Sequence, residues 1–187
     1  MSPPRVKQRR HAVLGLIAAC VTATNSHAQK PFPESWLGKW QGTLVTIAPP
    51  DSIRNRIPIS LEIAREPNDT AFVWRTIFNA DTVRGNRPYR LLIENAAKGI
   101  YATDESNGVL LDETFLGGLL TSVFQVQTRV LESRYSLRGD TLTHELTWWD
   151  TSPTRTVKGT GANSEAGTEI RSFRVQGMQR AVMTRQH

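Results

Sequence analysis

Cysteine is nearly absent from this sequence, because Cys20 is the only one among 187 residues. A single cysteine excludes an internal disulfide framework and any zinc or iron–sulfur site that several cysteines would build. Long apolar runs are absent as well. The run at residues 12–23 has twelve residues, whereas a membrane-spanning helix needs about 20.

Motifs for nucleophilic catalysis are also scarce. After residue 28 the only histidines are His144 and the terminal His187, and no Gly-x-Ser-x-Gly segment occurs. A Ser–His–acid set would have to use His144 with a serine that the sequence does not identify. A hydrolase that uses two carboxylates stays open, but we assign no catalytic residue.

Residues 1–28 have the three-part layout of a secretory signal peptide. Four basic residues precede the apolar run: Arg5, Lys7, Arg9 and Arg10. The segment Ser26–Ala28 then supplies small residues at the positions that a signal peptidase reads. We therefore expect export from a bacterial cytoplasm, cleavage after Ala28 and a periplasmic or secreted product.

An alternative signal centres on Cys20. The segment Ile17–Cys20 resembles the lipobox of bacterial lipoproteins, in which the cysteine is acylated and becomes the first residue. Such an anchor at Cys20 is the only membrane contact that we expect. The pair Arg9-Arg10 also resembles a twin-arginine signal, without its flanking residues. Cleavage after Ala28 is favoured because the apolar run continues past Cys20.

The basic net charge of +6 belongs mainly to this leader. Residues 29–187 contain 19 Lys and Arg against 17 Asp and Glu, a net charge of +2. The basic residues near the C-terminus are interleaved with apolar ones, as on the outer face of a strand. A nucleic-acid surface needs a clustered basic patch with aromatic residues, so we expect no nucleic-acid partner.

Alternation with a period of two dominates the rest of the chain. Ile57, Ile59, Leu61 and Ile63 alternate with other residues, and similar patterns recur toward the C-terminus. Asn107-Gly108 is a strong hairpin signal. The one segment considered as a helix, Asp112–Leu120, is short and contains two glycines. Nine or ten short strands predict a sandwich or a barrel, with a linker at 29–33 and one domain at 34–187.

The first expected strand carries a family resemblance. Gly38-x-Trp40-x-Gly42, followed by an antiparallel meander, resembles the calycin superfamily of lipocalins, fatty-acid-binding proteins, avidins and nitrobindins, and the nitrobindins most. The resemblance implies an all-β, antiparallel up-and-down barrel of about 8–10 strands. It also implies that Trp40 closes one end and packs on a basic residue of the last strand, for which we expect Arg174 or Arg180. Residues 101–112 look like a segment of small exported bacterial proteins of unassigned role.

The alternation sorts inward from outward side chains. Half of the expected inward set is aromatic: Trp40, Leu44, Ile59, Leu61, Phe72, Trp74, Tyr89, Leu91, Phe124, Val126, Tyr135, Leu137, Leu142, Leu146, Trp148 and Phe173. We expect a small, largely apolar ligand inside the barrel, in contact with Trp74, Tyr89, Phe124, Tyr135, His144 and Trp148. The alternative is a filled barrel that serves as a structural or interaction protein of the cell envelope.

His144 shares the inward parity of Leu142 and Leu146. Three roles are consistent with it: a haem ligand, as the nitrobindin resemblance implies, a polar contact to another ligand, or a core histidine satisfied by Tyr135, Tyr89 or the backbone. We favour the core histidine. Nothing else in the sequence specifies haem, so no cofactor is expected.

Four acids flank the Asn107-Gly108 turn: Asp104, Glu105, Asp112 and Glu113. They could serve a hydrolase, but their spacing matches no calcium loop and we expect a solvated face and no metal. The next segment, residues 115–120, is apolar with two glycines. Phe115, Leu116 and Leu119 are candidates for a lid over the barrel mouth, and a buried crossover with a glycine bulge is the favoured alternative.

The mass of the exported protein tests the leader. We expect a mature chain that begins at Gln29, because the apolar run does not end at Cys20. A mature chain that begins at an acylated Cys20 would instead establish the lipoprotein alternative.

Overall fold

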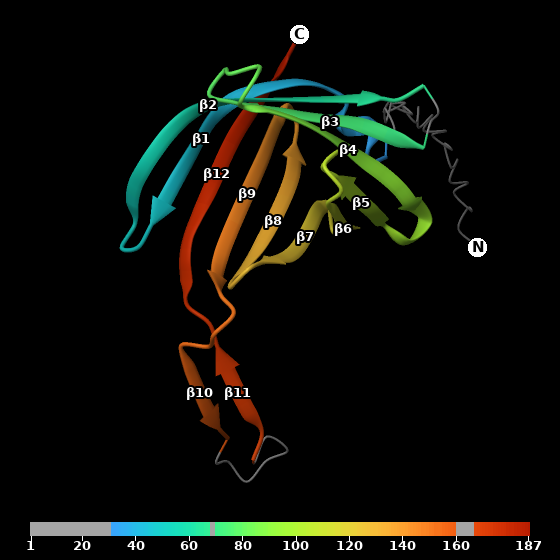
Figure 1. Cartoon of the computed structure of the whole chain (residues 1–187). Coiled ribbons are helices and arrows are strands. Elements are labelled where there is room, and N and C mark those ends of the chain that lie inside the picture. Colours follow the sequence, from blue (N-terminus) through green and yellow to red (C-terminus); the bar gives the residue numbers. More distant parts are fainter. Residues whose placement is uncertain (1–30, 68–69, 160–166) are drawn as a thin grey trace, which may run out of the picture. The chain divides into compact units, whose positions relative to one another are not determined.

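Ten strands of the described chain close into one antiparallel barrel (Figure 1). This computed structural model describes residues 31–67, 70–159 and 167–187. The expected signal peptide and its Cys20 lie outside the described residues. The elements are, in chain order, η1 (Glu34–Trp36), β1 (Gly38–Ala48), β2 (Ser52–Arg65), β3 (Ala71–Phe78), β4 (Asn86–Asn95), η2 (Ala96–Lys98), β5 (Ile100–Asp104), β6 (Leu110–Leu116), β7 (Leu119–Val126), β8 (Arg129–Arg138), β9 (Thr141–Asp150), β10 (Arg155–Lys158), β11 (Glu169–Ser172) and β12 (Val175–Gln186).

The barrel is an up-and-down meander with one interruption. β1 pairs with both β2 and β12, which closes the sheet. β9 pairs with β12 because β10 and β11 form a separate two-stranded sheet. The expected all-β, antiparallel up-and-down barrel is therefore confirmed. No helix in the described part of the chain has the length and hydropathy to span a membrane.

Two glycines make the turn between β6 and β7. Gly117 and Gly118 have φ angles of 60° and 83°, and two-residue hairpin turns with positive φ at both positions favour glycine. The helix considered for Asp112–Leu120 is therefore wrong, because these residues form β6, this turn and β7. The favoured buried crossover is wrong for the same reason. The expected hairpin at Asn107-Gly108 is confirmed between β5 and β6.

Alternate residues of each strand face the interior and form the core. Eight members of the expected inward set are buried: Trp40, Leu44, Ile59, Leu61, Phe72, Trp74, Leu91 and Leu142. The inward placement expected for Val126 and Phe173 is wrong, because 53% and 44% of their surface is exposed. Val126 lies beside the β7–β8 turn, and Phe173 lies between β11 and β12. Tyr101 and Met183 are buried core residues that the expected set omitted.

Trp40 and Arg185 close one end of the barrel. They are cross-strand partners in β1 and β12. The guanidinium carbon of Arg185 lies 4.1 Å from the centroid of the Trp40 ring, which is fully buried. Arg185 also donates hydrogen bonds to the Leu37 and Ser35 carbonyls, and Trp40 Nε1 donates to the Trp36 carbonyl at 3.0 Å. The two side chains thus tie the chain before β1 to the first and last strands.

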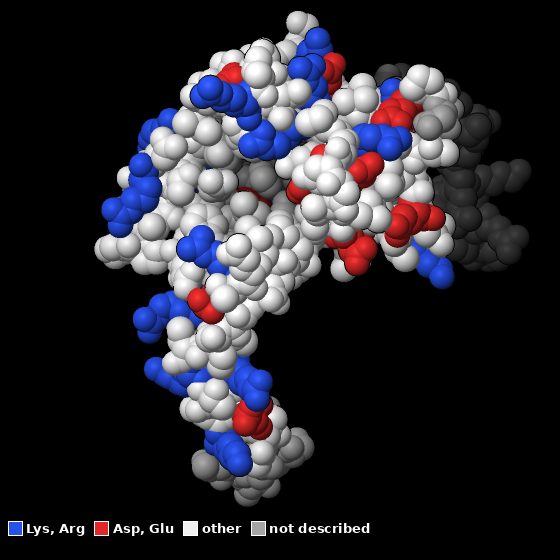
Figure 2. Space-filling model, in the orientation of Figure 1, with Lys and Arg blue, Asp and Glu red and all other residues white. Residues whose placement is uncertain are grey.

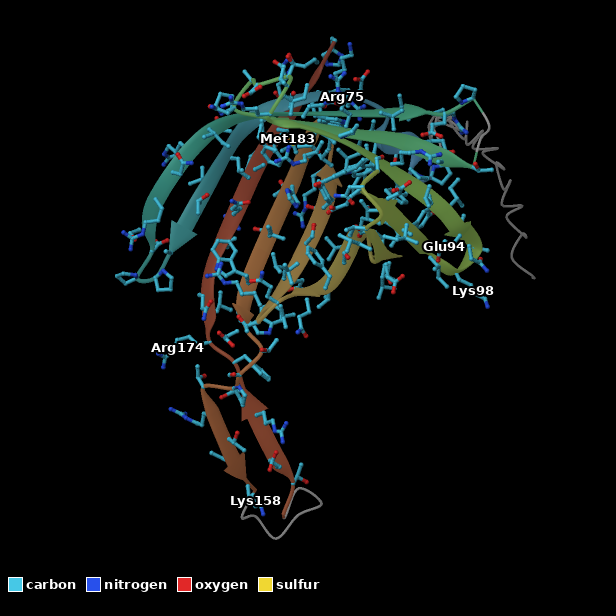
Figure 3. The ribbon with its side chains drawn as sticks, viewed as in Figure 1. Arg75, Glu94, Lys98, Lys158, Arg174 and Met183 are labelled. Carbon is cyan, nitrogen blue, oxygen red and sulfur yellow. The ribbon has the colours of Figure 1, made fainter. Side chains whose placement is uncertain are left out.

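The arginines expected in this role lie elsewhere. Arg174 lies between β11 and β12, away from the barrel strands (Figure 3). Arg180 is on β12 but points outward, where its Nε donates to Glu145 Oε1 at 2.7 Å. Inward residues of β12 have odd numbers, as buried Ala181 and Met183 show, so Arg185 has the required parity and Arg180 does not.

Aromatic side chains complete this end. Phe32 stacks on Phe115 with ring centroids 4.1 Å apart and contacts the rings of Trp36 and Tyr101 edge-on. Pro33 is buried. The described part of the expected linker therefore belongs to the packing of the barrel. We call Phe32, Trp36, Trp40, Phe115 and Arg185 the end plug.

A matched pair of arginine variants tests the plug. We expect Arg185→Ala to lower the free energy of unfolding by about 2–4 kcal/mol, because it removes a cation–π contact and leaves two part-buried carbonyls without their donor. Arg180→Ala on the same strand removes only an exposed ion pair and should cost less than about 1 kcal/mol. Urea unfolding measures both, and equal losses would contradict the proposed importance of Arg185.

Candidate functional site

A cavity of about 160 Å³ lies inside the barrel. Inward residues of β3 to β9 and of β12, with one from the β5–β6 turn, form its wall: Trp74, Thr76, Phe78, Tyr89, Thr103, Glu105, Leu111, Glu113, Phe124, Ser133, Tyr135, His144, Leu146 and Gln179. The space-filling view is hollowed at its centre, inside the ring of strands (Figure 2). The barrel interior is therefore filled at the end plug and open further along.

Five of the six expected ligand contacts lie on this wall: Trp74, Tyr89, Phe124, Tyr135 and His144. Trp148 does not. It lies against Gly177 of β12, where an added Cβ would come within 2.4 Å of Trp148 Cζ2. The period of two thus placed most of these side chains on one surface, while their contact with a ligand stays a prediction.

Aromatic contacts connect the cavity to the end plug. Trp74 lies 6.2 Å from Trp36 of the plug, centroid to centroid, and meets Tyr135 edge-on at 5.4 Å. Tyr135 in turn stacks on His144, with centroids 4.0 Å apart and ring planes 10° from parallel. This side of the wall is therefore held by ring-to-ring packing that begins at the closed end.

His144 is held as an uncharged side chain. Its Nε2 lies 3.1 Å from Ser133 Oγ on the neighbouring strand. Burial lowers the pKa of His144 to about 4, because the imidazolium loses its hydration. The hydrogen-bond partner is Ser133 and not Tyr135, Tyr89 or the backbone, while Tyr135 stacks on the ring. A core histidine and a polar contact to a ligand both stay predictions. A cavity of 160 Å³ with one face of His144 covered does not fit haem.

The Ser133–His144 pair has the residue types of a nucleophile and its base. Ser133 lies within β8, whose backbone pairs with both β7 and β9, so its strand N–H groups serve the sheet and not an oxyanion. A histidine with a pKa of about 4 is also a weak base at neutral pH. The geometry is that of a hydrogen-bonded pair in a wall.

Glu113 is the polar residue that sequence reasoning placed wrongly. Only 6% of it is exposed, and its Oε1 accepts a hydrogen bond from Thr103 Oγ1 at 3.0 Å. No group in the described residues hydrogen-bonds to its Oε2. Burial raises the pKa of Glu113 to about 7. A solvated face was expected for this acid, but the parity of β6 turns it inward with Leu111.

The other three acids do not gather with Glu113. Asp104 lies 3.4 Å from Arg90 in an ion pair. Glu105 is on the cavity wall and accepts from Asn107 Nδ2 at 3.2 Å, whereas Asp112 borders a separate outer groove. Among the described side chains no three His, Cys, Asp or Glu are arranged to hold a metal ion.

The lid candidates are not on the cavity wall. Phe115 packs in the end plug. Leu116 and Leu119 are cross-strand partners beside the glycine turn and are 76% and 39% exposed. A movement of this hairpin stays a prediction, but its described position is away from the cavity.

Glu113 and His144 give opposite pH dependences of stability. Between pH 4.5 and 7 the folded state keeps a proton on Glu113 that the unfolded chain releases, so stability falls as pH rises. Between pH 6.5 and 4 the unfolded chain protonates His144 and the folded state does not, so stability falls as pH drops. Over its whole pH range, each pKa shift changes the free energy of unfolding by about 3 kcal/mol, and the two changes oppose one another.

Single variants should separate the two effects. Relative to the wild type, Glu113→Gln should make stability rise more steeply from pH 4 to 6.5, and His144→Gln should make it fall more steeply from pH 4.5 to 7. Chemical denaturation at four pH values measures the differences. Slopes unchanged from the wild type would show that these groups titrate normally in the folded state.

No protein-family model and no curated protein matches this chain. Its fold is similar to the crystal structure of a protein of unknown function from Nostoc punctiforme PCC 73102 that belongs to the DUF3598 family. The TM-score is 0.54 and the sequence identity is 14%. The match covers 80% of this chain and 47% of the other, so this chain spans about half the length of that neighbour. At this identity the likeness establishes the fold alone.

Proposed function

We propose that this protein is an exported binding protein that holds a small, largely apolar molecule inside a calycin-like barrel. The observation that carries the proposal is the 160 Å³ cavity, walled by aromatic rings and a few placed polar groups. Such a combination is typical of small-molecule sites. Ring-to-ring packing on one side of the wall limits the cost of ordering side chains on binding.

The cavity volume sets the ligand size. An apolar cavity of about 150 Å³ is large enough for benzene. A molecule of about six to ten non-hydrogen atoms therefore matches the 160 Å³ available here. Larger lipids would need the barrel to open further.

Two features support a calycin-like barrel. Gly38-x-Trp40 stands at the start of β1, and a basic residue of the last strand, Arg185, covers the Trp40 ring. Both are implied by the resemblance found in the sequence, although the arginine differs from the two expected. The DUF3598 neighbour adds a similar fold and no ligand.

Export is proposed from the leader alone. The basic start, the apolar run and Ser26–Ala28 support a periplasmic or secreted location. If Cys20 is acylated, the same barrel would be anchored to a membrane.

Binding is favoured over Ser–His nucleophilic catalysis by the state of two polar groups on the wall. His144 is uncharged and already hydrogen-bonded, and Ser133 lies within a paired strand. A hydroxyl and an uncharged imidazole on the wall support a role in complementing a bound molecule. They are not arranged to move a proton at neutral pH.

Neighbouring leucines on β6 provide the test. Leu111 is on the cavity wall, and Leu110 is 56% exposed on the other face. We expect toluene, benzyl alcohol or benzylamine to bind one molecule per chain in calorimetry. Leu111→Trp should fill the cavity and weaken that binding more than 10-fold, whereas Leu110→Trp should change it less than about 2-fold.

Failure of all three compounds to bind the folded wild type would overturn the proposal. Equal binding to both tryptophan variants would place the site outside the cavity. Native mass spectrometry of protein purified from the exported fraction provides a further check, because a retained small molecule would give a defined mass increase.

A further inference from the structure

We propose that the ligand carries a protonated amine and that the Glu113 carboxylate binds it inside the cavity. This inference rests on the proposed binding function and specifies the class of ligand. It assigns Glu113 as the residue that determines specificity, with the aromatic wall around the cation.

The first argument is the fixed, unpartnered oxygen. Glu113 is 94% buried, and Thr103 fixes its Oε1 at 3.0 Å. Its Oε2 has no hydrogen-bond partner in the described residues and belongs to a side chain on the cavity wall. A buried acceptor without a donor is costly. A ligand that brings an N–H group to this oxygen would satisfy it.

The second argument is the charge of the wall. It holds two carboxylates, Glu105 and Glu113, and no Lys or Arg is among the described residues that line it. His144 adds no positive charge, because burial lowers its pKa to about 4. A bound anion would therefore add to buried negative charge, whereas a bound cation would neutralise it.

The third argument is the aromatic surface. Five aromatic residues line the same cavity: Trp74, Phe78, Tyr89, Phe124 and Tyr135. Faces of aromatic rings attract organic cations, most strongly where water is excluded. Rings and a carboxylate on one wall together suit a compact ammonium group on an apolar body.

Other ligand classes fit less well. A hydrocarbon would leave Glu113 Oε2 without a donor. An alcohol would donate a hydrogen bond but bring no charge, and hydrogen bonds to charged groups are the stronger ones. The amine is the class that satisfies both the oxygen and the charge.

Binding should depend on pH through Glu113. Burial raises its pKa to about 7 in the free protein, so the carboxylate form becomes dominant between pH 6 and 8. The ammonium group of the ligand stays protonated over this range. Benzylamine should therefore bind up to about 10-fold more tightly at pH 8 than at pH 6. The other titratable side chains that face this part of the interior are Tyr89, Tyr101, Glu105, Tyr135 and His144.

These neighbours can be separated from Glu113. Burial raises the pKa of all three tyrosines, so they stay neutral between pH 6 and 8. His144 is neutral over the same range. Glu105 is the remaining acid on the wall, and Glu105→Gln is a second control for the charge of the wall.

Calorimetry with benzylamine and benzyl alcohol tests the proposal, because the two differ only in the amine and the hydroxyl. At pH 8 the wild type should bind benzylamine at least 10-fold more tightly than benzyl alcohol. Glu113→Gln should weaken benzylamine binding about 10- to 100-fold and abolish its pH dependence, while benzyl alcohol changes less than about 3-fold. Glu94→Gln is the matched control, because Glu94 is exposed on β4 outside the cavity (Figure 3).

The outcomes distinguish this proposal from the binding function itself. If benzyl alcohol binds as tightly as benzylamine, or if Glu113→Gln binds benzylamine like the wild type, the amine proposal is overturned and the cavity remains a binding site. If toluene, benzyl alcohol and benzylamine all fail to bind, both proposals are overturned. Thermal unfolding confirms that Glu113→Gln is folded, which we expect because the variant loses a buried acid and keeps its shape.

Discussion

The contact between the Arg185 guanidinium and the Trp40 ring is the interaction on which the rest of the barrel depends. It joins the last strand to the first at the end where the chain enters the barrel, and through Leu37 and Ser35 it fixes the entering segment as well. A barrel of ten strands has enough interior to hold a ligand. Because the end plug fills this end, the remaining interior is a pocket that is closed at one end.

The same burial acts on two side chains in opposite directions. Water is excluded around Glu113 and His144, which favours the neutral form of each, so one pKa rises and the other falls. The Thr103 hydroxyl donates a hydrogen bond to one Glu113 oxygen, and the Ser133 hydroxyl forms a hydrogen bond with one His144 nitrogen. The histidine is additionally covered by Tyr135, whereas one buried carboxylate oxygen of Glu113 has no hydrogen-bond partner among the described residues. The interior is thus apolar over most of its surface, and among the described residues Glu113 Oε2 is a buried polar atom that lacks a hydrogen-bond partner.

Much of this arrangement could be predicted from the sequence, because a strand has a period of two. That rule placed Trp74, Tyr135 and His144 correctly on the inner surface. The rule failed where strand register determines a contact or where a charged residue is buried. Parity on β12 separates Arg185 from Arg180, but the cross-strand register that pairs Arg185 with Trp40 is not visible in the sequence. Glu113 was expected in solvent because acids are seldom buried, although its position on β6 shares the parity of Leu111.

The β10–β11 hairpin interrupts the meander without interrupting the barrel. Trp149 pairs with Val175 and Trp148 with Gly177, so β9 and β12 meet directly on the barrel side of the excursion. Every residue of β10 and β11 is exposed, and charged side chains such as Arg155 and Arg171 stand on both strands. The hairpin is therefore a permissive position in the chain. A tag, an epitope or a change of length could be accommodated there while the strand pairing that shapes the cavity is kept.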